Sequence, residues 1–291
     1  MRILITGANG QLGCELQTIL NSGAADIGPI PSEYLDAEVL PTDVEEMDIL
    51  NKDEVNATVA GFKPDLIINC AAFTNVDACE SQADLAMKLN ADGPQNLAEV
   101  AKQYGARIVH ISTDYVFSGK DPAPKVESDQ PEPQSVYGKT KLQGELKVAA
   151  ACTEYYIVRT AWLYGAVGNN FVQTMLKLAR ENGFIKVVND QYGNPTNAND
   201  LAYEILKIAL TDSYGIWHCT NEGTCSWFDF ASAIVDLADI PCEKNPCSTE
   251  EFVRPAPRPA YSSLENTRLQ TTIGNEMRPW KDALTTYLEK L

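Results

Sequence analysis

The sequence predicts an α/β protein, with a doubly wound parallel sheet of the Rossmann type and a smaller C-terminal lobe. Through the first 162 residues, short and nearly continuous apolar runs alternate with stretches of helical spacing. Such apolar runs are typical of strands that helices cover on both faces. The first run also leads directly into "TGANGQLG", a strand, glycine turn and helix start. This order is typical of a dinucleotide-binding unit.

The first half contains the elements of the expected sheet and two expected loops. Residues 22–37 are rich in glycine and proline and delay the second strand, which predicts a surface insertion. The proline-rich residues 120–134 predict a loop between a strand and a helix, and long loops often form walls of functional sites. The expected strands are 2–6, 38–42, 65–72, 106–112 and 155–162, and the expected helices are 11–21, 51–60, 82–104 and 135–151.

After Trp162 the alternation becomes irregular. The remaining pieces are too few for a second independent sheet domain, so we expect a lobe that packs on the first domain and bounds a cleft. Residues 1–162 would be mainly dinucleotide-binding and residues 163–291 mainly substrate-binding, with the chain free to cross between them. The pieces are helices at 170–182, 198–210 and 227–239, a strand at 185–188, a Pro/Arg stretch at 254–260 and a final helix from about 279.

The net charge argues against several classes of partner, and the cysteine spacing argues against zinc and disulfide sites. Forty acidic residues against 23 lysines and arginines give a net charge of −17, which argues against nucleic acid or an anionic membrane as a partner. The chain has no apolar run near the ~18 residues of a membrane helix and no signal-peptide pattern, so we expect a cytoplasmic protein. The eight cysteines include no C-x-x-C pair, which predicts reduced thiols and neither a zinc site nor a disulfide framework. Pairing of Cys242 with Cys247 stays open.

The glycine turn points to a bound pyrophosphate. Gly7, Gly10 and Gly13 follow the first strand and open the first helix. Glycine permits the tight turn, the approach of a pyrophosphate and close packing of helix on strand, while helix N–H groups hold the phosphates. The G-x-x-G-x-x-G spacing differs from the G-x-G-x-x-G of the usual fingerprint.

The second strand predicts which dinucleotide binds. Asp43 is the best candidate for the acid that holds the adenosine ribose, and Asp48 with Ile49 could pass beneath the adenine. Between Arg2 and Lys52 there is no lysine or arginine to hold a 2′-phosphate. The sequence therefore predicts a preference for NADH over NADPH.

Acid–base chemistry is indicated by two later segments. Thr113 and Asp114 lie at the carboxyl end of the fourth expected strand, where open α/β sheets bind ligands. Tyr137 and Lys141 are four residues apart on the next helix and so share a face. A phenol with a pKa near 10 is a poor proton donor or acceptor at neutrality, but an adjacent ammonium and an oxidised nicotinamide would lower that pKa. Tyr137 could then protonate a carbonyl oxygen.

The order of these motifs resembles that of the extended short-chain dehydrogenase/reductases. Within them, the dTDP-4-dehydrorhamnose reductases match over nearly the whole chain. The resemblance implies reduction of the C4 ketone of dTDP-4-dehydro-L-rhamnose to dTDP-L-rhamnose by hydride from a nicotinamide cofactor. It rests on "GANGQLG", "INCAAFTNVDACE", "STDYVFSG", "VYGKTKLQGE", "RTAWLYG", "GNNFVQTML", "VVNDQYGNPT" and "RPAPRPAYSSLEN".

The resemblance also implies roles for individual residues. Thr113, Tyr137 and Lys141 match the catalytic hydroxyl, acid and lysine. Some family members bind Mg²⁺ at a dimer interface and Glu15 could match one ligand, but the spacing establishes no metal site, and a monomer and a homodimer both stay open. The implied cofactor contacts are Gly7, Asn9, Gly10, Gln11, Leu12, Gly13, Asp43, Asp48, Ile49, Asn69, Ala71, Ala72, Thr74, Tyr137 and Lys141, and the implied contacts of the dTDP-deoxyhexulose are Thr74, Asp114, Trp162, Asn170 and Arg258.

Two other functions fit the same scaffold. One is a nucleotide-sugar epimerase or dehydratase, which would retain its nicotinamide through each cycle. The other is a non-catalytic regulatory subunit of the methionine adenosyltransferase type, against which the intact Thr113, Tyr137, Lys141 and Trp162 argue. His110 and His218 lie within or at the end of expected strands, and we interpret both as packed residues rather than catalysts.

Overall fold

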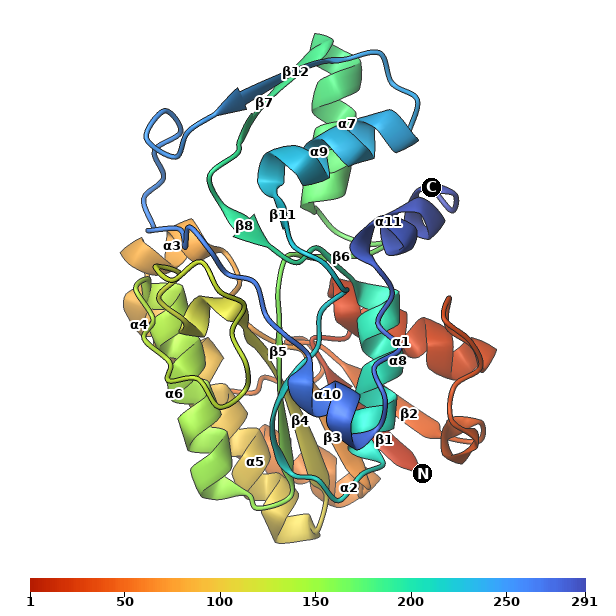
Figure 1. Ribbon diagram of the computed structural model, residues 1–291. Helices are drawn as coiled ribbons and strands as arrows, with labels where there is room; N and C mark the ends of the chain where they lie inside the picture. The colour runs from red at the N-terminus through yellow and green to blue at the C-terminus, as the bar shows by residue number, and fades with distance from the viewer.

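A six-stranded parallel sheet forms the base of the molecule. The computed structural model describes residues 1–291 and has the strand order β10-β5-β4-β3-β1-β2 (Figure 1). The chain moves outward from β1 to β2 and then returns to β3 on the other side of β1, so the order reverses between β1 and β3. Ligands of open α/β sheets bind at such a switch point. The strands are β1 (Arg2–Thr6), β2 (Glu38–Thr42), β3 (Leu66–Asn69), β4 (Arg107–Thr113), β5 (Tyr155–Thr160) and β10 (Gly215–His218).

Alternate residues of each strand enter two separate cores, which confirms the doubly wound fold. Ile3 and Ile5 pack with α1 (Gln11–Ser22) and α8 (Ala198–Ala209). Leu4 points the other way, into a core with α2 (Lys52–Phe62), α5 (Gly93–Tyr104) and the end of α6 (Val136–Ala151). The period of two in a strand requires this split.

The helix expected at 82–104 is interrupted. It comprises α4 (Ala83–Met87), a π-helical turn (Lys88–Asp92) and α5, and a further short helix, α3 (Val76–Ser81), precedes it. Pro94 occupies the first turn of α5. Because proline has no N–H to continue the hydrogen-bond ladder, regular α-helix cannot run through this point.

A smaller lobe lies above the sheet in Figure 1. Its core joins Tyr164, Phe230 and Trp280. The strand β12 (Glu243–Cys247) was not expected, because "EKNPC" is polar and contains a proline, and it pairs in parallel with β7 (Phe184–Val188). The other elements are α7 (Phe171–Asn182), α9 (Trp227–Leu237), α11 (Trp280–Leu288) and the strand pairs β8 (Tyr192–Gly193) with β11 (Cys225–Ser226) and β6 (Leu163–Tyr164) with β9 (Thr196–Asn197).

Part of the C-terminal half belongs to the sheet layer rather than to the lobe. Beyond residue 162 the chain crosses back to the sheet layer, a crossing that the sequence left open, because β10 pairs with β5 and α8 packs on α1. Fully buried Leu201 and Ile205 of α8 join Leu16 of α1 in one core. The short helix α10 (Thr267–Thr272) returns to this side as well, through buried Leu269.

The insertion at 22–37 is more than the surface loop that we expected. Its short 3₁₀ turn (Ser32–Tyr34) carries Tyr34, which is fully buried and donates a hydrogen bond from its hydroxyl to the carbonyl of Leu206 at 2.9 Å. The sequence could not show this, because the partner lies 172 residues further along the chain. The insertion therefore fixes α8 from the outside.

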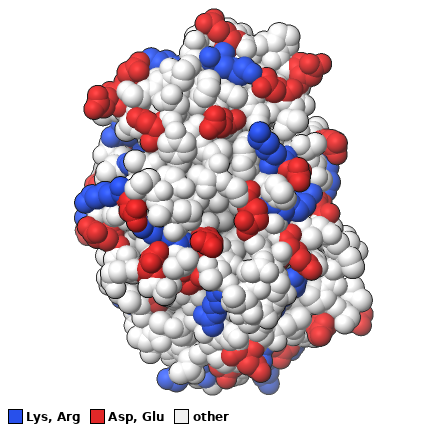
Figure 2. Space-filling view, viewed as in Figure 1, with Lys and Arg blue, Asp and Glu red and all other residues white.

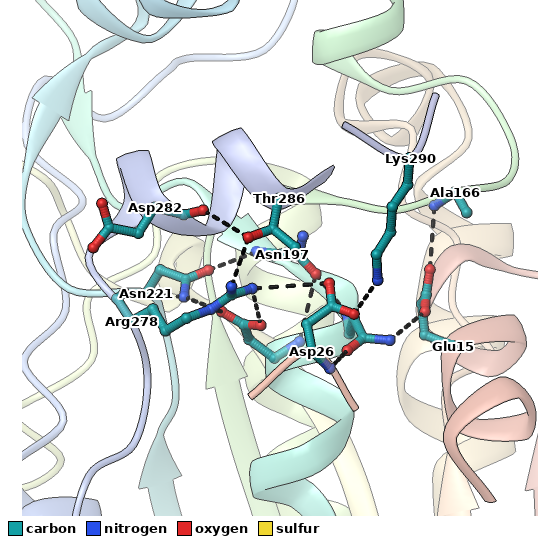
Figure 3. Close-up of polar contacts among 11 residues, drawn as sticks. Glu15, Asp26, Ala166, Asn197, Asn221, Arg278, Asp282, Thr286 and Lys290 are labelled. Atoms are coloured by element: carbon teal, nitrogen blue, oxygen red, sulfur yellow. Dashed lines mark hydrogen bonds and ion pairs between the residues drawn. The ribbon is translucent and has the colours of Figure 1, made fainter. Parts of the chain in front are cut away.

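A polar network joins the insertion to the C-terminal helix (Figure 3). Arg278 donates from Nη2 and Nε to the carboxylate of Asp200 at 2.7 and 3.0 Å, and the Asp200 side chain is fully buried. Arg278 also lies 3.9 Å from Asp26 in the insertion, and Asp26 forms an ion pair with Lys290 near the C-terminus. Through Asp200 on α8, this network ties the lobe to the sheet layer.

Charged side chains of both signs are interspersed on the face that Figure 2 shows, without a broad basic patch.

No helix is long and apolar enough to cross a membrane. All eight cysteines are free thiols, including Cys242 and Cys247.

We expect Arg278→Met to lower the free energy of unfolding by about 3–5 kcal/mol, because it leaves the buried Asp200 carboxylate without its cation. Lys290→Met is the matched control, since Lys290 is 59% exposed and its loss should cost less than about 1 kcal/mol. Equilibrium denaturant titration measures both values. Equal effects would show that the network does not depend on the buried pair.

Candidate active site

A cleft of about 670 Å³ lies at the carboxyl ends of the strands, beneath the lobe. It runs from the glycine turn after β1, past the end of β4 and the start of α6, to two tryptophans of the lobe. Lys141 is the only lysine or arginine among the residues that line it. Residues expected in three separate motifs thus share one cavity.

The glycine turn is shaped for the close approach of a ligand. Gly7 has φ +63°, and a Cβ there would lie 2.7 Å from the backbone nitrogen of Ala71, so only glycine fits. Helix α1 begins without a side-chain cap, and the amides of Gln11, Leu12 and Gly13 have no acceptor within the chain. These residues line the cleft. Free N–H groups at a helix start are donors suited to a pyrophosphate, so the turn fits a dinucleotide.

The end of the cleft beside β2 is acidic. Asp43 follows β2 directly and accepts a hydrogen bond from the Asn9 amide at 3.2 Å, which fixes it beside the glycine turn. Asp48 and Ile49 line the same end, as do Val44 and Met47. No cation lies there to meet a further phosphate.

A buried ion pair fixes the rotation of α6. Glu145 accepts from Nε and Nη2 of Arg159 at 2.9 and 2.6 Å and from the hydroxyl of Ser112 at 2.5 Å. Tyr137 and Lys141 precede Glu145 by eight and four residues on the same helix face. Anchoring Glu145 to β4 and β5 therefore directs Tyr137 and Lys141 to the carboxyl ends of these strands.

Burial has the largest effect on the pKa values of Tyr137 and Lys141. It lowers the pKa of Lys141 to about 8, opposed by the charge of Glu145, and Nζ donates to the carbonyl of Ile111 at 2.6 Å. Burial also raises the pKa of Tyr137 well above its usual value, and the Thr113 hydroxyl opposes that shift. The lowering of this pKa that the sequence predicts requires an oxidised nicotinamide beside Lys141, and it stays a prediction. At neutral pH Tyr137 is a protonated phenol, which is the form of a proton donor.

Asp114 presents an acceptor at the end of β4. Its Oδ1 accepts from the Thr113 hydroxyl at 2.8 Å, whereas Oδ2 is buried without a hydrogen-bond partner. The Ser262 hydroxyl lies near enough to lower the pKa of Asp114, but its hydrogen bond goes to the carbonyl of Tyr192 at 3.4 Å. Burial raises the pKa of Asp114 to about 6, so the group is ionised at neutral pH. A ligand hydroxyl would satisfy the open oxygen.

Trp162 forms the far wall of the cleft and is held on two sides. Its indole stacks on Trp227, with ring centroids 3.5 Å apart and an interplanar angle of 6°. Gly193 lies against the ring, because a Cβ at that position would be 2.6 Å from Cε2 of Trp162. Strand β8 ends at Gly193 and pairs with β11, which precedes Trp227 directly, so one small sheet supplies both contacts. Trp162 itself has φ +46°, an uncommon conformation for a side chain of this size.

Three residues that the sequence assigned to the site do not line the cleft. Asn69 lies below the cleft floor and bonds to Thr6, Ala71 and His110. Asn170 caps α7 by accepting from the Gln173 amide at 3.0 Å.

The third of these residues, Arg258, forms an ion pair with Asp77 at 2.9 Å and donates to the Tyr115 hydroxyl at 3.3 Å. The carboxylate of Asp77 thereby balances the charge of this guanidinium. Arg254 is half-exposed and lies 3.8 Å from the same carboxylate.

Sequence reasoning missed several residues of the cleft wall. Trp227 is the most prominent of them, since it starts α9 after the capping residue Ser226, and its spacing did not separate it from a core aromatic. Gly168 follows β6 and lies over the glycine turn near Gln11. The other unexpected lining residues are Thr6, Val44, Met47, Cys70, Val76, Leu89, Ile111, Tyr115, Thr160, Ala161 and Leu163.

A family model described as the RmlD substrate binding domain matches residues 1–291. The chain belongs to this family. The match spans both the sheet layer and the lobe, so the cleft between them lies within it.

Curated relatives agree with this family. The spore coat polysaccharide biosynthesis protein SpsK of Bacillus subtilis is 38% identical over 289 residues, covering 99% of this chain and 97% of that protein. The dTDP-4-dehydrorhamnose reductase of Aggregatibacter actinomycetemcomitans is 41% identical over 296 residues, covering 97% of each. These matches confirm the resemblance to the dTDP-4-dehydrorhamnose reductases.

Solved structures agree as well. A dTDP-4-dehydrorhamnose reductase of Clostridium acetobutylicum superposes with a TM-score of 0.94 at 51% identity, covering 100% of this chain and 99% of that one. That of Bacillus anthracis, in complex with NADP, superposes with a TM-score of 0.94 at 41% identity, with the same coverage. A UDP-glucose 4-epimerase of Thermus thermophilus with NAD has a TM-score of 0.82 at 19% identity, covering 99% of this chain and 98% of that one, and shows the shared fold alone.

Glu15 takes part in hydrogen bonds within the chain. Its carboxylate accepts from the side chain of Asn199 at 2.9 Å and from the amide of Ala166 at 3.4 Å (Figure 3). No group of three or more histidine, cysteine, aspartate or glutamate side chains is placed to hold a metal ion.

Proposed function

We propose that this chain reduces the C4 ketone of dTDP-4-dehydro-L-rhamnose to dTDP-L-rhamnose with a nicotinamide cofactor. One observation carries the proposal: a buried, protonated phenol, Tyr137, lies in the cleft between a glycine turn that fits a dinucleotide and the Trp162 wall. Membership of the RmlD family and the names of the relatives support the choice of substrate.

The residues of the chain divide the reaction between them. The reduced nicotinamide, when bound, supplies a hydride to the carbonyl carbon. Tyr137 gives its phenolic proton to the carbonyl oxygen, and the hydroxyl of Thr113 would turn from Asp114 to donate to that oxygen. The resulting phenolate is stabilised by the positive charge of Lys141, one helical turn away on the same face. Lys141 also offers its ammonium protons to the hydroxyls of the nicotinamide ribose.

The substrate would occupy the part of the cleft between Asp114 and Trp162. The open Oδ2 of Asp114 accepts from a sugar hydroxyl, and the Trp162 indole covers an apolar face of the ring. Thr74 also lines the cleft, and we assign it contacts with both ligands. The diphosphate would draw Arg258 away from Asp77, since a doubly charged anion competes well for a guanidinium.

The direct assay is oxidation of NADH with dTDP-4-dehydro-L-rhamnose, with the product identified by NMR. Turnover that consumes one NADH for each dTDP-L-rhamnose formed supports the proposal. Purified protein that carries stoichiometric NAD⁺ and interconverts sugars without net NADH oxidation would favour an epimerase or dehydratase. Association with a methionine adenosyltransferase and no turnover with any ketosugar nucleotide would favour a regulatory subunit.

Tyr137→Phe should lower kcat by about 10²–10⁴, the usual contribution of a positioned proton donor. NADH affinity should stay nearly unchanged, because the ring and Lys141 remain. Steady-state turnover and a fluorescence titration with NADH measure the two quantities. Tyr104→Phe, at a 38% exposed tyrosine on α5, is the matched control, and a Tyr137→Phe variant with normal turnover would remove Tyr137 from the mechanism.

NADH should be preferred to NADPH by about fivefold or more in kcat/KM. The 2′-phosphate would approach Asp43 without a compensating cation, and repulsion between partly solvated charges costs about 1 kcal/mol or more. Asp43→Asn should reduce the preference by removing the negative charge. A higher kcat/KM with NADPH in the unmodified protein would refute this assignment.

Gly193→Ala should raise the KM for the sugar nucleotide by roughly tenfold and leave NADH affinity unchanged. The new methyl group collides with Trp162, whose ring cannot retreat because it stacks on Trp227, and such overpacking typically costs about 1–3 kcal/mol. Gly61→Ala is the control, since a Cβ at Gly61 on α2 meets no atom within 4 Å. An unchanged sugar KM in Gly193→Ala would show that the position of Trp162 does not limit binding.

A further inference from the structure

His110 lies in the middle of β4, fully buried, between Asn69 and Lys141. Its Nδ1 is 2.9 Å from Nδ2 of Asn69, and its Nε2 is 3.4 Å from Nζ of Lys141. The histidine thus connects a residue below the cleft floor with a residue of the proposed catalytic pair. The inference about it rests on the function proposed for Lys141.

The orientation of the Asn69 amide is fixed by its neighbours. Its Oδ1 accepts from the Thr6 hydroxyl at 2.7 Å and from the backbone amide of Ala71 at 3.2 Å. Because a backbone N–H can only donate, the side-chain atom that it meets must be the oxygen. The NH₂ group of Asn69 is therefore the atom that faces His110.

This orientation determines where His110 carries its proton. The NH₂ group of Asn69 can only donate, so Nδ1 of His110 accepts and is unprotonated. Burial and the charge of Lys141 hold the pKa of His110 well below its usual value, so the ring is neutral. Its single proton is then on Nε2, directed at Lys141.

We propose that Asn69 and His110 are positioning residues that set the charge of Lys141. The Nε2–H of His110 points at the ammonium of Lys141, and both groups can only donate. The repulsion between these two donors lowers the pKa of Lys141. When Lys141 is neutral, its lone pair accepts from the same N–H. The pair therefore favours the neutral amine and limits the pH range over which Lys141 is a cation.

The other groups around Lys141 act in the opposite direction or are neutral. Glu145, one turn further along α6, favours the ammonium. The Cys70 thiol, which follows β3, stays protonated because burial raises its pKa to about 12, and Tyr137 stays a neutral phenol. The backbone carbonyl of Ile111 accepts from Nζ and favours the ammonium too. His110 is thus the one neighbour that presents a fixed donor.

The consequence for pH dependence has a definite sign. Lys141 has a pKa of about 8, below its usual value, so it is a cation below that pH and a neutral amine above it. Loss of the cation removes donors for the cofactor and the charge that stabilises the Tyr137 phenolate. NADH affinity and kcat/KM should therefore fall as the pH rises through about 8.

The tautomer can be measured directly, because the chain has only two histidines. His218 places Nδ1 3.0 Å from the carbonyl of Lys125 and must carry its proton there, whereas His110 must carry its proton on Nε2. Long-range ¹H–¹⁵N NMR spectra of histidine-labelled protein at pH 7, assigned with His218→Gln, should therefore show two opposite tautomers. A proton on Nδ1 of His110, or a charged His110, would overturn the proposal. This readout needs no turnover, so it stands even if the proposed substrate is wrong.

A second experiment measures NADH affinity in two variants that remove the Nε2–H donor facing Lys141. In Asn69→Asp the carboxylate accepts from Nδ1–H and leaves Nε2 as an acceptor, and His110→Gln can turn its carbonyl oxygen toward Lys141. Each should move the basic limb of the pH profile of NADH affinity upward by about one pH unit or more. Lys139→Gln, an exposed residue of the same helix, is the control and should leave the limb in place. If the variants bound NADH more weakly at every pH and the basic limb did not shift, Asn69 and His110 would have a merely structural role. That result would contradict the proposal.

Discussion

The buried ion pair between Glu145 and Arg159 is the contact on which the site depends. Both side chains are almost inaccessible to solvent, and the pair joins α6 to β5, with Ser112 of β4 as a third partner. A helix that packs only through apolar side chains can rotate by several degrees at little cost, but a bidentate guanidinium–carboxylate contact prescribes one orientation. The face that carries Glu145 also carries Lys141 and Tyr137, so one contact aims both at the cleft. The cost of burying the two charges is offset only in this geometry.

The position of the cleft follows from the way in which the chain crosses between its two layers. The lobe is not a separate unit added after the sheet, because β10 and α8 return to the sheet and the Arg278–Asp200 pair binds the last helix to α8. The two layers therefore hold a fixed distance across the cleft. The lobe contributes Trp162 and Trp227, and the sheet contributes the glycine turn and the phenol. A dinucleotide on one side of the cleft and a sugar nucleotide on the other need both layers at once.

Patterns of consecutive residues predicted the sheet layer well. The features that these patterns could not predict depend on contacts between residues far apart in the chain. The strands, the glycine turn and the Tyr137–Lys141 spacing are properties of a few consecutive residues, and apolar periodicity reports them directly. Residues 22–37 were taken for a surface insertion because Leu206, the partner of Tyr34, is remote in the chain, and β12 was missed because it is a polar edge strand. Asn69 and Arg258 were expected to line the cleft. The structure shows that neighbours distant in sequence, His110 and Asp77, hold them elsewhere.

The central claim is that Tyr137 and a reduced nicotinamide act together on one carbonyl of a sugar nucleotide. The most direct measurement uses NADH that carries deuterium at the transferred position, with dTDP-4-dehydro-L-rhamnose as substrate and NMR of the product. We expect one deuterium at C4 of the sugar, and the same label at a far lower rate with Tyr137→Phe. Deuterium that stays on the cofactor, or a product labelled at another carbon, would contradict it.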